Sequence, residues 1–275
     1  MLNPKPYLTT ARLNVIILLA WLLAGLERTL YIKKNEIIQD NNMVILKKLA
    51  SYLPLQFQQE IKRYYFARQI KKGTFQTDDP ECFRLHEWIN NGDWVLDIGA
   101  NIGRYTKRMS ELVGNTGWVI AFEPVSLTFE ILASNTALFS LENITLMNVA
   151  VSNKSRISGM VIPNWRKGCG EPRSKDYYKS HLVEENGDIS VLCITIDSLN
   201  FPYHISLVKI DVEGSELQVL QGMKNLIERD NPVFIIEGSK TTALRRQSEG
   251  YLESFGYSFE RGIHNRIFTF KEANK

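Results

Sequence analysis

The chain has 275 residues, of which 44% are hydrophobic and 23% charged, values typical of a globular protein rather than a disordered one. This length accommodates one α/β domain of ordinary size together with an extension. The three cysteines (Cys82, Cys169 and Cys193) form no C-x-x-C pair, which argues against a structural zinc site and suits a reducing, cytoplasmic compartment.

The net charge of +3 is unevenly distributed along the chain. Residues 1–75 contain 12 Lys and Arg against 4 Asp and Glu, a net charge of +8, and the remainder carries −5. We interpret residues 1–75 as a basic, partly hydrophobic helical extension and residues 76–275 as the main domain. A basic segment that also holds the most apolar stretch favours an anionic membrane surface as a partner over nucleic acid.

Residues 13–26 form an uncharged apolar stretch flanked by basic residues such as Arg12 and Arg28. A helix that spans a bilayer needs about 20 apolar residues, whereas stretches of about 10–14 are more often core helices, interfacial segments or signal regions. Three interpretations stay open: a helix packed in the protein or in a homo-oligomer, a membrane-embedded or interfacial anchor, and a signal peptide. No convincing small-x-small cleavage site follows the stretch.

Helices are predicted next over residues 43–52 and from Pro54 onward. The second has apolar residues at helical spacing between basic ones, which fits a core-facing amphipathic helix or a helix on a membrane surface. The run from Thr77 to Pro80 predicts a further helix start, leading into residues 81–90.

A buried strand over residues 94–98 runs into the turn Asp97-Ile98-Gly99-Ala100-Asn101-Ile102-Gly103 and then into a helix. Glycines in such a turn remove side chains where a ligand or a neighbouring backbone comes close. The dinucleotide fingerprint is Gly-x-Gly-x-x-Gly, but here the third position is Asn101 and the last glycine comes one residue early. Asp97 would repel a pyrophosphate but pair with an ammonium, which favours S-adenosylmethionine as the ligand.

Strands and helices alternate from residue 93 onward. Strands are predicted at 94–98, 118–122, 144–149, 205–210 and 232–237, helices at about 104–113, 126–140 and 215–228, and a final antiparallel pair at 257–260 and 266–270. This alternation predicts an open, doubly wound α/β sheet that binds ligands at the carboxyl ends of its strands. Residues 153–190 interrupt the rhythm, and we expect them to be an insertion that covers the substrate, with a mobile surface excursion as the alternative.

Polar residues follow three successive predicted strands. Asp97 closes the first, Glu123 closes the second, and Asn148-Val149-Ala150 closes the third. A carboxylate at the position of Glu123 offers two oxygens to the hydroxyls of a ribose, and the third group would border an adenine.

The fourth and fifth strands end in charged residues. The fourth is followed by Lys209-Ile210-Asp211-Val212-Glu213-Gly214-Ser215-Glu216, and the fifth ends at Glu237. Charged groups beside a buried strand are costly unless they are paired or used. Strand alternation points Asp211 and Glu213 in one direction, so these two are candidates for chemistry, whereas Glu216 fits a first-turn acid of the next helix.

These segments together resemble the FkbM family of S-adenosylmethionine-dependent methyltransferases. The resemblance covers roughly residues 77–260 and is carried by DIGANIG (97–103), AFEP (121–124), NVAVS (148–152), IDSL (196–199), KIDVEGSE (209–216) and IIE (235–237). It implies a class I, Rossmann-like methyltransferase fold with a seven-stranded sheet whose last strand is antiparallel. It also implies methyl transfer to a hydroxyl of a sugar, polyketide or similar metabolite. The cofactor-binding residues that it implies are Asp97, Gly99, Asn101 and Gly103 for the methionine part, Glu123 for the ribose, and Asn148, Val149 and Ala150 for the adenine.

Methyl transfer to a hydroxyl needs a group that accepts the hydroxyl proton. Asp211 or Glu213 is our candidate base, with Lys209 balancing the charge. A magnesium ion on Asp211, Glu213 and Glu237 is an alternative arrangement, and His181 or His264 is an alternative base.

Two other functions stay open: a nicotinamide-dependent oxidoreductase on a similar sheet, and a non-catalytic, membrane-associated nucleotide-binding module. The acceptor is not identified by any segment, although a glycolipid becomes the favoured class if residues 13–26 reach a membrane.

Overall fold

The computed structural model describes residues 54–163, 180–184, 186–237 and 241–271. The chain divides into two compact units, Met1–Arg68 and Gln69–Lys275. The described residues of the first unit are Pro54 and helix α3 (Leu55–Lys71) as far as Arg68. Helix α3 begins directly after Pro54, as the sequence predicts. The apolar stretch 13–26 and the predicted helix 43–52 lie outside the described residues. None of the helices within the described ranges combines the length and the apolar character that crossing a bilayer requires.

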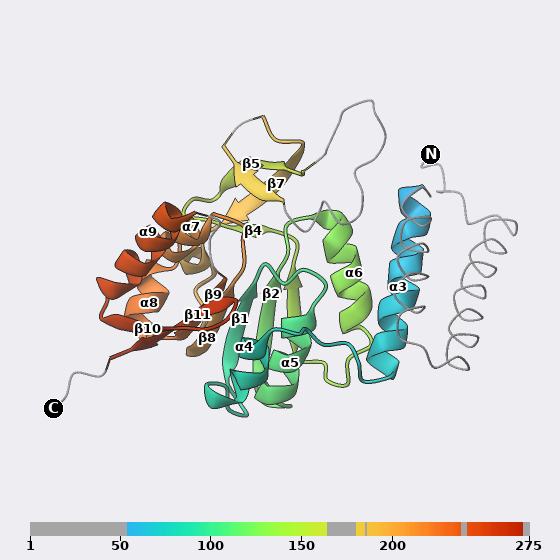
Figure 1. Ribbon diagram of the computed structural model, residues 1–275, viewed down its shortest axis with the longest axis horizontal. Helices are drawn as coiled ribbons and strands as arrows, with labels where there is room; N and C mark the ends of the chain where they lie inside the picture. Colours follow the sequence, from blue (N-terminus) through green and yellow to red (C-terminus); the bar gives the residue numbers. More distant parts are fainter. Residues whose placement is uncertain (1–53, 164–179, 185, 238–240, 272–275) are drawn as a thin grey trace, which may run out of the picture. The chain divides into compact units, whose positions relative to one another are not determined.

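The second unit is built on a seven-stranded central sheet (Figure 1). Its strand order is β10-β11-β9-β8-β1-β2-β3. The strands are β1 (Trp94–Ile98), β2 (Trp118–Phe122), β3 (Ile144–Met147), β8 (Ile205–Ile210), β9 (Val233–Glu237), β10 (Tyr257–Arg261) and β11 (Asn265–Phe270). Strands β3, β2, β1, β8 and β9 are parallel, and β11 runs antiparallel to both of its neighbours. This is the doubly wound sheet with an antiparallel last strand that the sequence predicts.

Helices cover both faces of the central sheet because its strands are apolar on both sides. Alternate residues of β1 separate into two clusters: Leu96 packs in the cluster that contains residues of helices α7 (Glu216–Gln221), α8 (Lys224–Asp230) and α9 (Thr242–Glu253), whereas Val95 packs with α5 (Arg104–Val113). Helix α6 (Ser126–Thr136) contributes Leu132 to a third cluster, with Ala121 of β2. Figure 1 shows α7, α8 and α9 in orange and red, and α5 and α6 in green.

Helix α4 (Pro80–Phe83) and the 3₁₀ helix η1 (Arg84–Glu87) precede β1 and pack on the α5 face. Pro80 occupies the first turn of α4, as predicted, but the helix expected over residues 81–90 is replaced by these two short segments.

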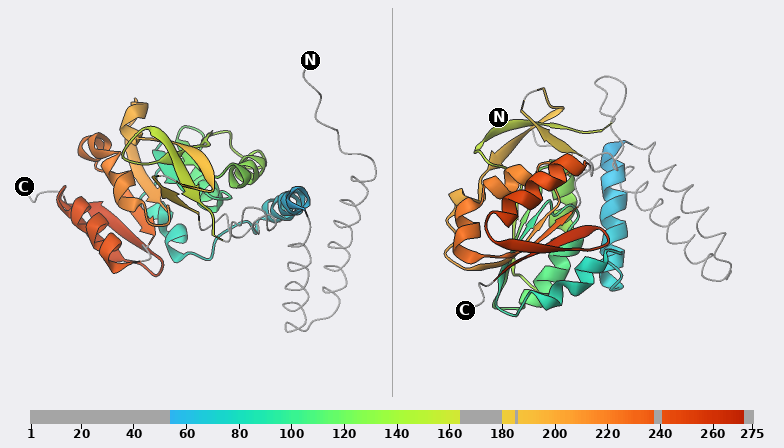
Figure 2. Two further views of the ribbon diagram at one scale, coloured as in Figure 1. Left: turned by 90° about the horizontal axis from the view of Figure 1, so that it is seen from above. Right: turned by 60° about the vertical axis from the view of Figure 1, so that its left-hand side comes forward.

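The insertion between β3 and β8 forms a second, small sheet, which lies above the central sheet in Figure 1 and in the right-hand view of Figure 2. Its strand order is β4-β7-β5-β6, with β4 (Ala150–Val151), β5 (Arg156–Val161), β6 (His181–Val183) and β7 (Ile189–Ile194). The strand predicted over residues 144–149 therefore ends early, at Met147, and the chain enters the small sheet at Ala150.

The predicted helix 215–228 is also wrong as a single element, because it divides into α7 and α8 at Gly222 and Met223. A Cβ on Gly222 would lie 2.0 Å from the carbonyl oxygen of Ser152, so the start of the small sheet packs against this break. Asp197, in the 3₁₀ helix η3 (Ile196–Leu199), then accepts hydrogen bonds from the backbone N–H groups of Asn225 and Leu226 at the start of α8.

Candidate active site

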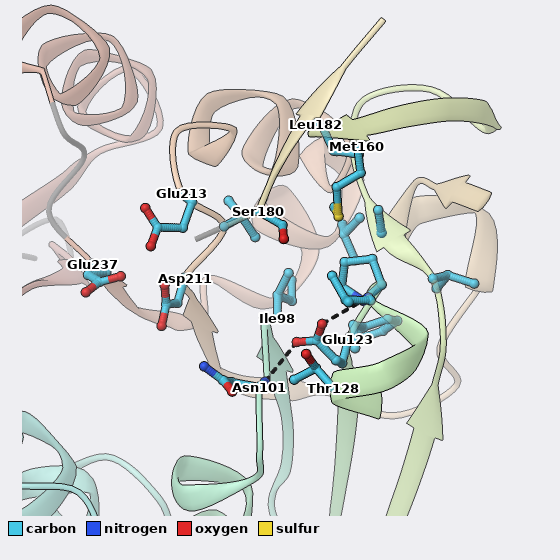
Figure 3. Close-up of a pocket in the computed structure, with 18 residues that line it drawn as sticks. Ile98, Asn101, Glu123, Thr128, Met160, Ser180, Leu182, Asp211, Glu213 and Glu237 are labelled. Carbon is cyan, nitrogen blue, oxygen red and sulfur yellow. Dashed lines mark hydrogen bonds between the residues drawn. The ribbon is translucent and has the colours of Figure 1, made fainter. Parts of the chain in front are cut away.

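A cavity of about 290 Å³ lies at the carboxyl ends of β1, β2, β8 and β9. Figure 3 shows Glu123 and Thr128 on one side of it, and Asp211, Glu213 and Glu237 on the other. The lining residues are Ile98, Gly99, Asn101, Phe122, Glu123, Pro124, Val125, Thr128, Val149, Ala150, Val151, Met160, Ser180, Leu182, Asp211, Val212, Glu213 and Glu237. Both sheets therefore contribute to its wall.

The glycines of the first turn make room for other parts of the protein. Gly99 has a φ of +82°, and a Cβ there would lie 1.8 Å from the carbonyl oxygen of Asp211. Gly103 has a φ of +92°, and its Cβ would lie 2.7 Å from the Cδ1 atom of Leu132. Gly99 lines the cavity and Gly103 does not. From the sequence we expect either a ligand or a neighbouring part of the chain beside these glycines. At both positions the structure places another part of the chain there.

Glu123 is held at the end of β2 by two backbone hydrogen bonds (Figure 3). Its Oε2 accepts from the N–H of Asn101 at 3.0 Å, and its Oε1 accepts from the N–H of Val125 at 3.0 Å. Burial raises the pKa of this carboxyl to about 7, although both hydrogen bonds lower it. The two oxygens are thus fixed in place beside the cavity, each with a further lone pair for a ligand hydroxyl.

Asn101 adds a second acceptor to this side of the turn. It adopts a left-handed conformation, with a φ of +53°. Its side-chain Oδ1 is buried and finds no hydrogen-bond partner among the described residues, although Asn101 lines the cavity. A buried acceptor of this kind fits a ligand that brings a donor.

The predicted adenine-bordering residues separate into two roles. Val149 and Ala150 line the cavity. Asn148 does not, because its Nδ2 donates to the carbonyl oxygens of Glu123 at 2.8 Å and Pro124 at 3.1 Å. Asn148 therefore supports the turn that carries Glu123.

Lys209 is a buried cation between two acids. It is 4% exposed, and its Nζ donates to Oδ2 of Asp211 at 3.0 Å and lies 4.0 Å from Oδ1 of Asp97. Burial alone would lower the pKa of Lys209, but the charges of Asp211 and Asp97 raise it to about 12. The Nζ also lies 4.9 Å from the ring centroid of Tyr105.

Asp97 is fully buried and is not a lining residue of the cavity. Its Oδ2 accepts from the hydroxyl of Thr106 at 2.6 Å, and β1 and β8 pair Asp97 with Lys209 in register. Burial raises the pKa of Asp97, while Lys209 lowers it. The sequence predicted a ligand ammonium beside Asp97, but the ammonium that the structure places there is that of Lys209.

Asp211, Glu213 and Glu237, here called the rim acids, line the cavity opposite Glu123. Asp211 and Glu237 each shift the pKa of the other. A hydrogen bond with Asp211, followed by burial, raises the pKa of Glu237 to about 8. The pKa of Asp211 is lowered, because Lys209 and Glu237 together outweigh the effect of burial.

Glu216 lies apart from the rim acids. It is 2% exposed, and its Oε1 accepts from the N–H of Gly214 at 2.9 Å, at the first turn of α7. The interpretation of Glu216 as a first-turn acid is the one that this geometry supports.

The described residues support neither the alternative metal site nor the alternative histidine bases. No three His, Cys, Asp or Glu side chains in the described ranges form a group that would hold a metal ion, so the magnesium site on the rim acids is not supported. The Lys209 ammonium already neutralises Asp211. His181 and His264 are not among the lining residues.

Sequence reasoning missed the apolar and hydroxyl residues of the cavity wall. Val125 and Thr128 lie within five residues of Glu123, so their place in the wall could have been found from the sequence. Met160 and Leu182 belong to the small sheet, and Ser180 directly precedes its strand β6. Only the expectation that residues 153–190 cover the substrate pointed to these last three.

Comparisons with known proteins give a family and several relatives. The model of the methyltransferase FkbM domain matches residues 97–259. The hexuronic acid methyltransferase AglP of Haloferax volcanii is 30% identical over 162 residues, which cover 55% of this chain and 58% of that protein. The chain thus spans little more than half the length of this relative.

Two further relatives are more distant. The methyltransferase sdnD of Sordaria araneosa is 23% identical over 206 residues, covering 66% of this chain and 79% of that protein. The crystal structure of methyltransferase FkbM from Methylobacillus flagellatus is 15% identical with a TM-score of 0.44, covering 84% of this chain and 59% of that one.

Proposed function

Because the chain belongs to the family of methyltransferases with an FkbM domain, we propose that its cavity binds S-adenosylmethionine and that it methylates a hydroxyl oxygen. The observation that carries this proposal is the cavity itself, with the fixed Glu123 carboxyl on one wall and the rim acids on the other.

The residues of the cavity fit this cofactor chemically. Two oriented oxygens of Glu123 suit the paired hydroxyls of a ribose, and the unsatisfied Oδ1 of Asn101 suits a ligand donor. Val149 and Ala150 offer an apolar border for a base. None of these groups is a cation, which suits a cofactor without phosphate better than a dinucleotide.

S-adenosylmethionine supplies a methyl group on a positively charged sulfur. The chain's own task is to bind and orient the acceptor, exclude water and take the hydroxyl proton. The rim acids are the groups for the proton, and Lys209 keeps two of the neighbouring carboxyls balanced inside the sheet. Met160 and Leu182 of the small sheet help to close the cavity from above.

A sugar hydroxyl is the acceptor that we favour. The support is the relative from Haloferax volcanii, whose name gives hexuronic acid as its substrate. Polyketide-like metabolites and glycolipids are the classes to compare with it.

The first test is calorimetric titration of the full chain with S-adenosylhomocysteine, with NAD as the comparison ligand. We expect binding of S-adenosylhomocysteine alone, weakened at least tenfold in Glu123→Ala and unchanged in the exposed control Glu142→Ala. Folded protein that binds NAD instead would support an oxidoreductase, and folded protein that binds neither would overturn the methyltransferase proposal.

A second test identifies the acceptor. Incubation with methyl-labelled S-adenosylmethionine and uronic acid glycosides, neutral glycosides or glycolipids, followed by mass spectrometry, locates the transferred methyl group. Label on a hydroxyl oxygen supports the proposal, whereas label on a carboxylate, carbon or nitrogen contradicts it. Cofactor binding without turnover on any acceptor class would favour a non-catalytic module.

A further inference from the structure

We propose that Asp211 and Glu237 act as one proton-accepting pair, in which Glu237 is the carboxyl that takes the proton of the acceptor hydroxyl. The pair lies at two neighbouring strand ends on one wall of the cavity (Figure 3). This inference rests on the proposed methyl transfer.

The sheet brings the two carboxyls together. Strands β8 and β9 are parallel neighbours in which Ile210 pairs with Ile236, so Asp211 and Glu237 occupy the next position at the carboxyl edge. Both side chains line the same cavity, and each shifts the pKa of the other. Two ionised carboxylates at neighbouring strand ends repel, so the resting pair carries one proton.

The surroundings decide which member holds that proton. Asp211 faces the ammonium of Lys209 at 3.0 Å, and its side chain is 29% exposed. Glu237 is exposed and meets no such cation at hydrogen-bond distance in the described chain. The direction of the two pKa shifts agrees with this assignment: that of Asp211 is lowered, and that of Glu237 is raised to about 8.

Other charged groups face Glu237 from neighbouring elements. Glu213 raises its pKa and Lys209 lowers it. Arg245 and Glu249 of α9 and Arg266 of β11 line a small depression beside Glu237. Arg266 is paired with Glu249 at 2.5 Å, so the charge of that arginine is largely neutralised.

This assignment separates the work of the two acids. An acid with a lowered pKa is a weak base, so Asp211 alone is poorly suited to a sugar hydroxyl, whereas ionised Glu237 has a proton affinity near the working pH. Asp211 raises that affinity through its hydrogen bond and charge. Asp211 therefore positions and tunes Glu237.

The proposed proton transfer has two stages. The pair first loses its shared proton to solvent, which a positive charge in the cavity favours. The acceptor O–H bond then breaks, and its proton passes to the Glu237 carboxylate. The electron pair left on oxygen forms the bond to the methyl carbon, and the electrons of the broken carbon–sulfur bond stay on sulfur. Because Glu237 is exposed, its proton returns to solvent in the next cycle.

The test measures protons rather than turnover. The full chain is titrated calorimetrically at pH 7 with S-adenosylmethionine and with S-adenosylhomocysteine, in two buffers of different ionisation enthalpy. We expect the protein to release about half a proton or more for each S-adenosylmethionine bound. It should release less on binding S-adenosylhomocysteine, whose sulfur is uncharged. In Glu237→Gln the extra release seen with S-adenosylmethionine should vanish while the affinity for S-adenosylhomocysteine is kept, and in the exposed control Glu142→Gln the extra release should persist.

Equal release from wild type and Glu237→Gln, or binding without release in wild type, overturns the pair and leaves the methyltransferase proposal intact. No binding of either ligand by folded protein overturns both. Proton release on adding Mg²⁺ alone would identify the pair as a metal site and overturn its role as a base.

Turnover gives an independent readout once an acceptor is known. The rate of the wild type should rise with pH along the ionisation of the pair. In Glu237→Gln this rise of the rate with pH (the acidic limb of the pH–rate profile) should disappear, and kcat should fall by about 10²–10⁴-fold. Asp211→Asn should move the limb to lower pH, because it removes the main cause of the raised pKa of Glu237. An unchanged limb in both variants would overturn the proposal.

Discussion

Lys209 holds together charges that come from two strands. It lies 3.0 Å from a carboxylate oxygen of Asp211 and 4.0 Å from one of Asp97, and it is almost wholly buried. A buried ion pair adds little net stability, because desolvation offsets the attraction, but removal of one partner leaves an uncompensated charge in the interior. The main role of Lys209 is therefore to keep the carboxylates of Asp97 and Asp211 from being buried without a counter-charge.

Lys209→Met should lower the free energy of unfolding by about 3–5 kcal/mol at pH 8. Without the cation, the folded-state pKa values of Asp97 and Asp211 rise above their unfolded values, so the loss should shrink as the pH falls toward 5 and the acids take up protons. Urea denaturation at both pH values measures this. The control Lys224→Met, on a side chain that is 58% exposed, should change stability by less than about 0.5 kcal/mol. An equal loss at both pH values would contradict the electrostatic explanation.

Gly99→Ala should destabilise the second unit by about 2–4 kcal/mol, because a Cβ at a φ of +82° would lie 1.8 Å from the carbonyl oxygen of Asp211. The matched control is Gly250→Ala in α9, where a Cβ would meet nothing within 4 Å. It should stabilise the protein by about 0.5–1 kcal/mol. Thermal denaturation compares the two, and similar effects of both substitutions would argue against a close approach at Gly99.

The raised pKa of Glu123, about 7, predicts pH-dependent cofactor binding. Ionised Glu123 accepts ligand hydroxyls better than the protonated form, so the affinity for S-adenosylhomocysteine should fall as the pH drops below about 7, by up to about tenfold per pH unit. Calorimetric titrations between pH 6 and 8 test this, with Glu123→Gln expected to bind weakly and without pH dependence. A constant wild-type affinity over that range would show that Glu123 does not titrate with ligand binding.

Among the elements, α4 and the β10–β11 hairpin are joined through one buried carboxylate. Glu81 of α4 is 2% exposed, and it accepts hydrogen bonds from the backbone N–H groups of Ile263 and His264 and from the side chain of Asn265. Burial alone would raise the pKa of Glu81, but these hydrogen bonds hold it below its usual range. The stability that they supply is present above the unfolded pKa and is lost as the pH falls through the folded one.

Glu81→Gln should therefore loosen the hairpin turn, because an amide N–H₂ would face backbone donors. We expect a loss of about 1–3 kcal/mol at pH 7 and faster amide hydrogen exchange at residues 261–265. Glu87→Gln is the control, since that side chain lies on the surface at 39% exposure. Unchanged exchange in the turn of Glu81→Gln would contradict the proposed anchoring.

The elements that the sequence predicted best are those fixed by local pattern. Strands 94–98, 118–122 and 205–210 have the predicted bounds, because short apolar runs buried on both faces leave little freedom in where a strand ends. The break between α7 and α8 arises from Ser152 and Asp197, which lie far from it in sequence. Within residues 215–228 the local signal is Gly222, and an isolated glycine inside a helical pattern does not by itself end a helix.

The same distinction applies to the cavity. Glu123, Asp211, Glu213 and Glu237 follow strands directly, and a parallel sheet brings such positions to one edge. The partner of Asp97 was not foreseen, because it depends on the register between β1 and β8. Met160 and Leu182 depend on how the small sheet closes over the central one, which local sequence does not encode.

On the scale of the whole molecule, every residue that lines the cavity belongs to the second compact unit. A chain that lacks residues 1–73 should therefore bind S-adenosylhomocysteine within about threefold of the full chain, as expected for a domain with its own core. Calorimetry on both proteins measures this, with circular dichroism as the check on folding. A folded truncated chain that does not bind would contradict the independence of the second unit.

Membrane association is a proposal that rests on residues 1–75 and their net charge of +8. The same two proteins test it by flotation with anionic vesicles. The full chain should float with the vesicles and the truncated chain should not, and high salt should weaken the association. Equal flotation of the two proteins would contradict membrane association through residues 1–75.

The small sheet leaves and re-enters the main domain at neighbouring points. Its first strand, Ala150–Val151, pairs in parallel with Cys193 and Ile194 at the end of β7, and the N–H of Ser152 donates to the carbonyl oxygen of Ile194 at 2.9 Å. The two ends of this excursion therefore lie side by side, and its replacement should leave the central strands in place. We expect a chimera that exchanges residues 153–190 with those of a relative to keep cofactor binding and to change the acceptor.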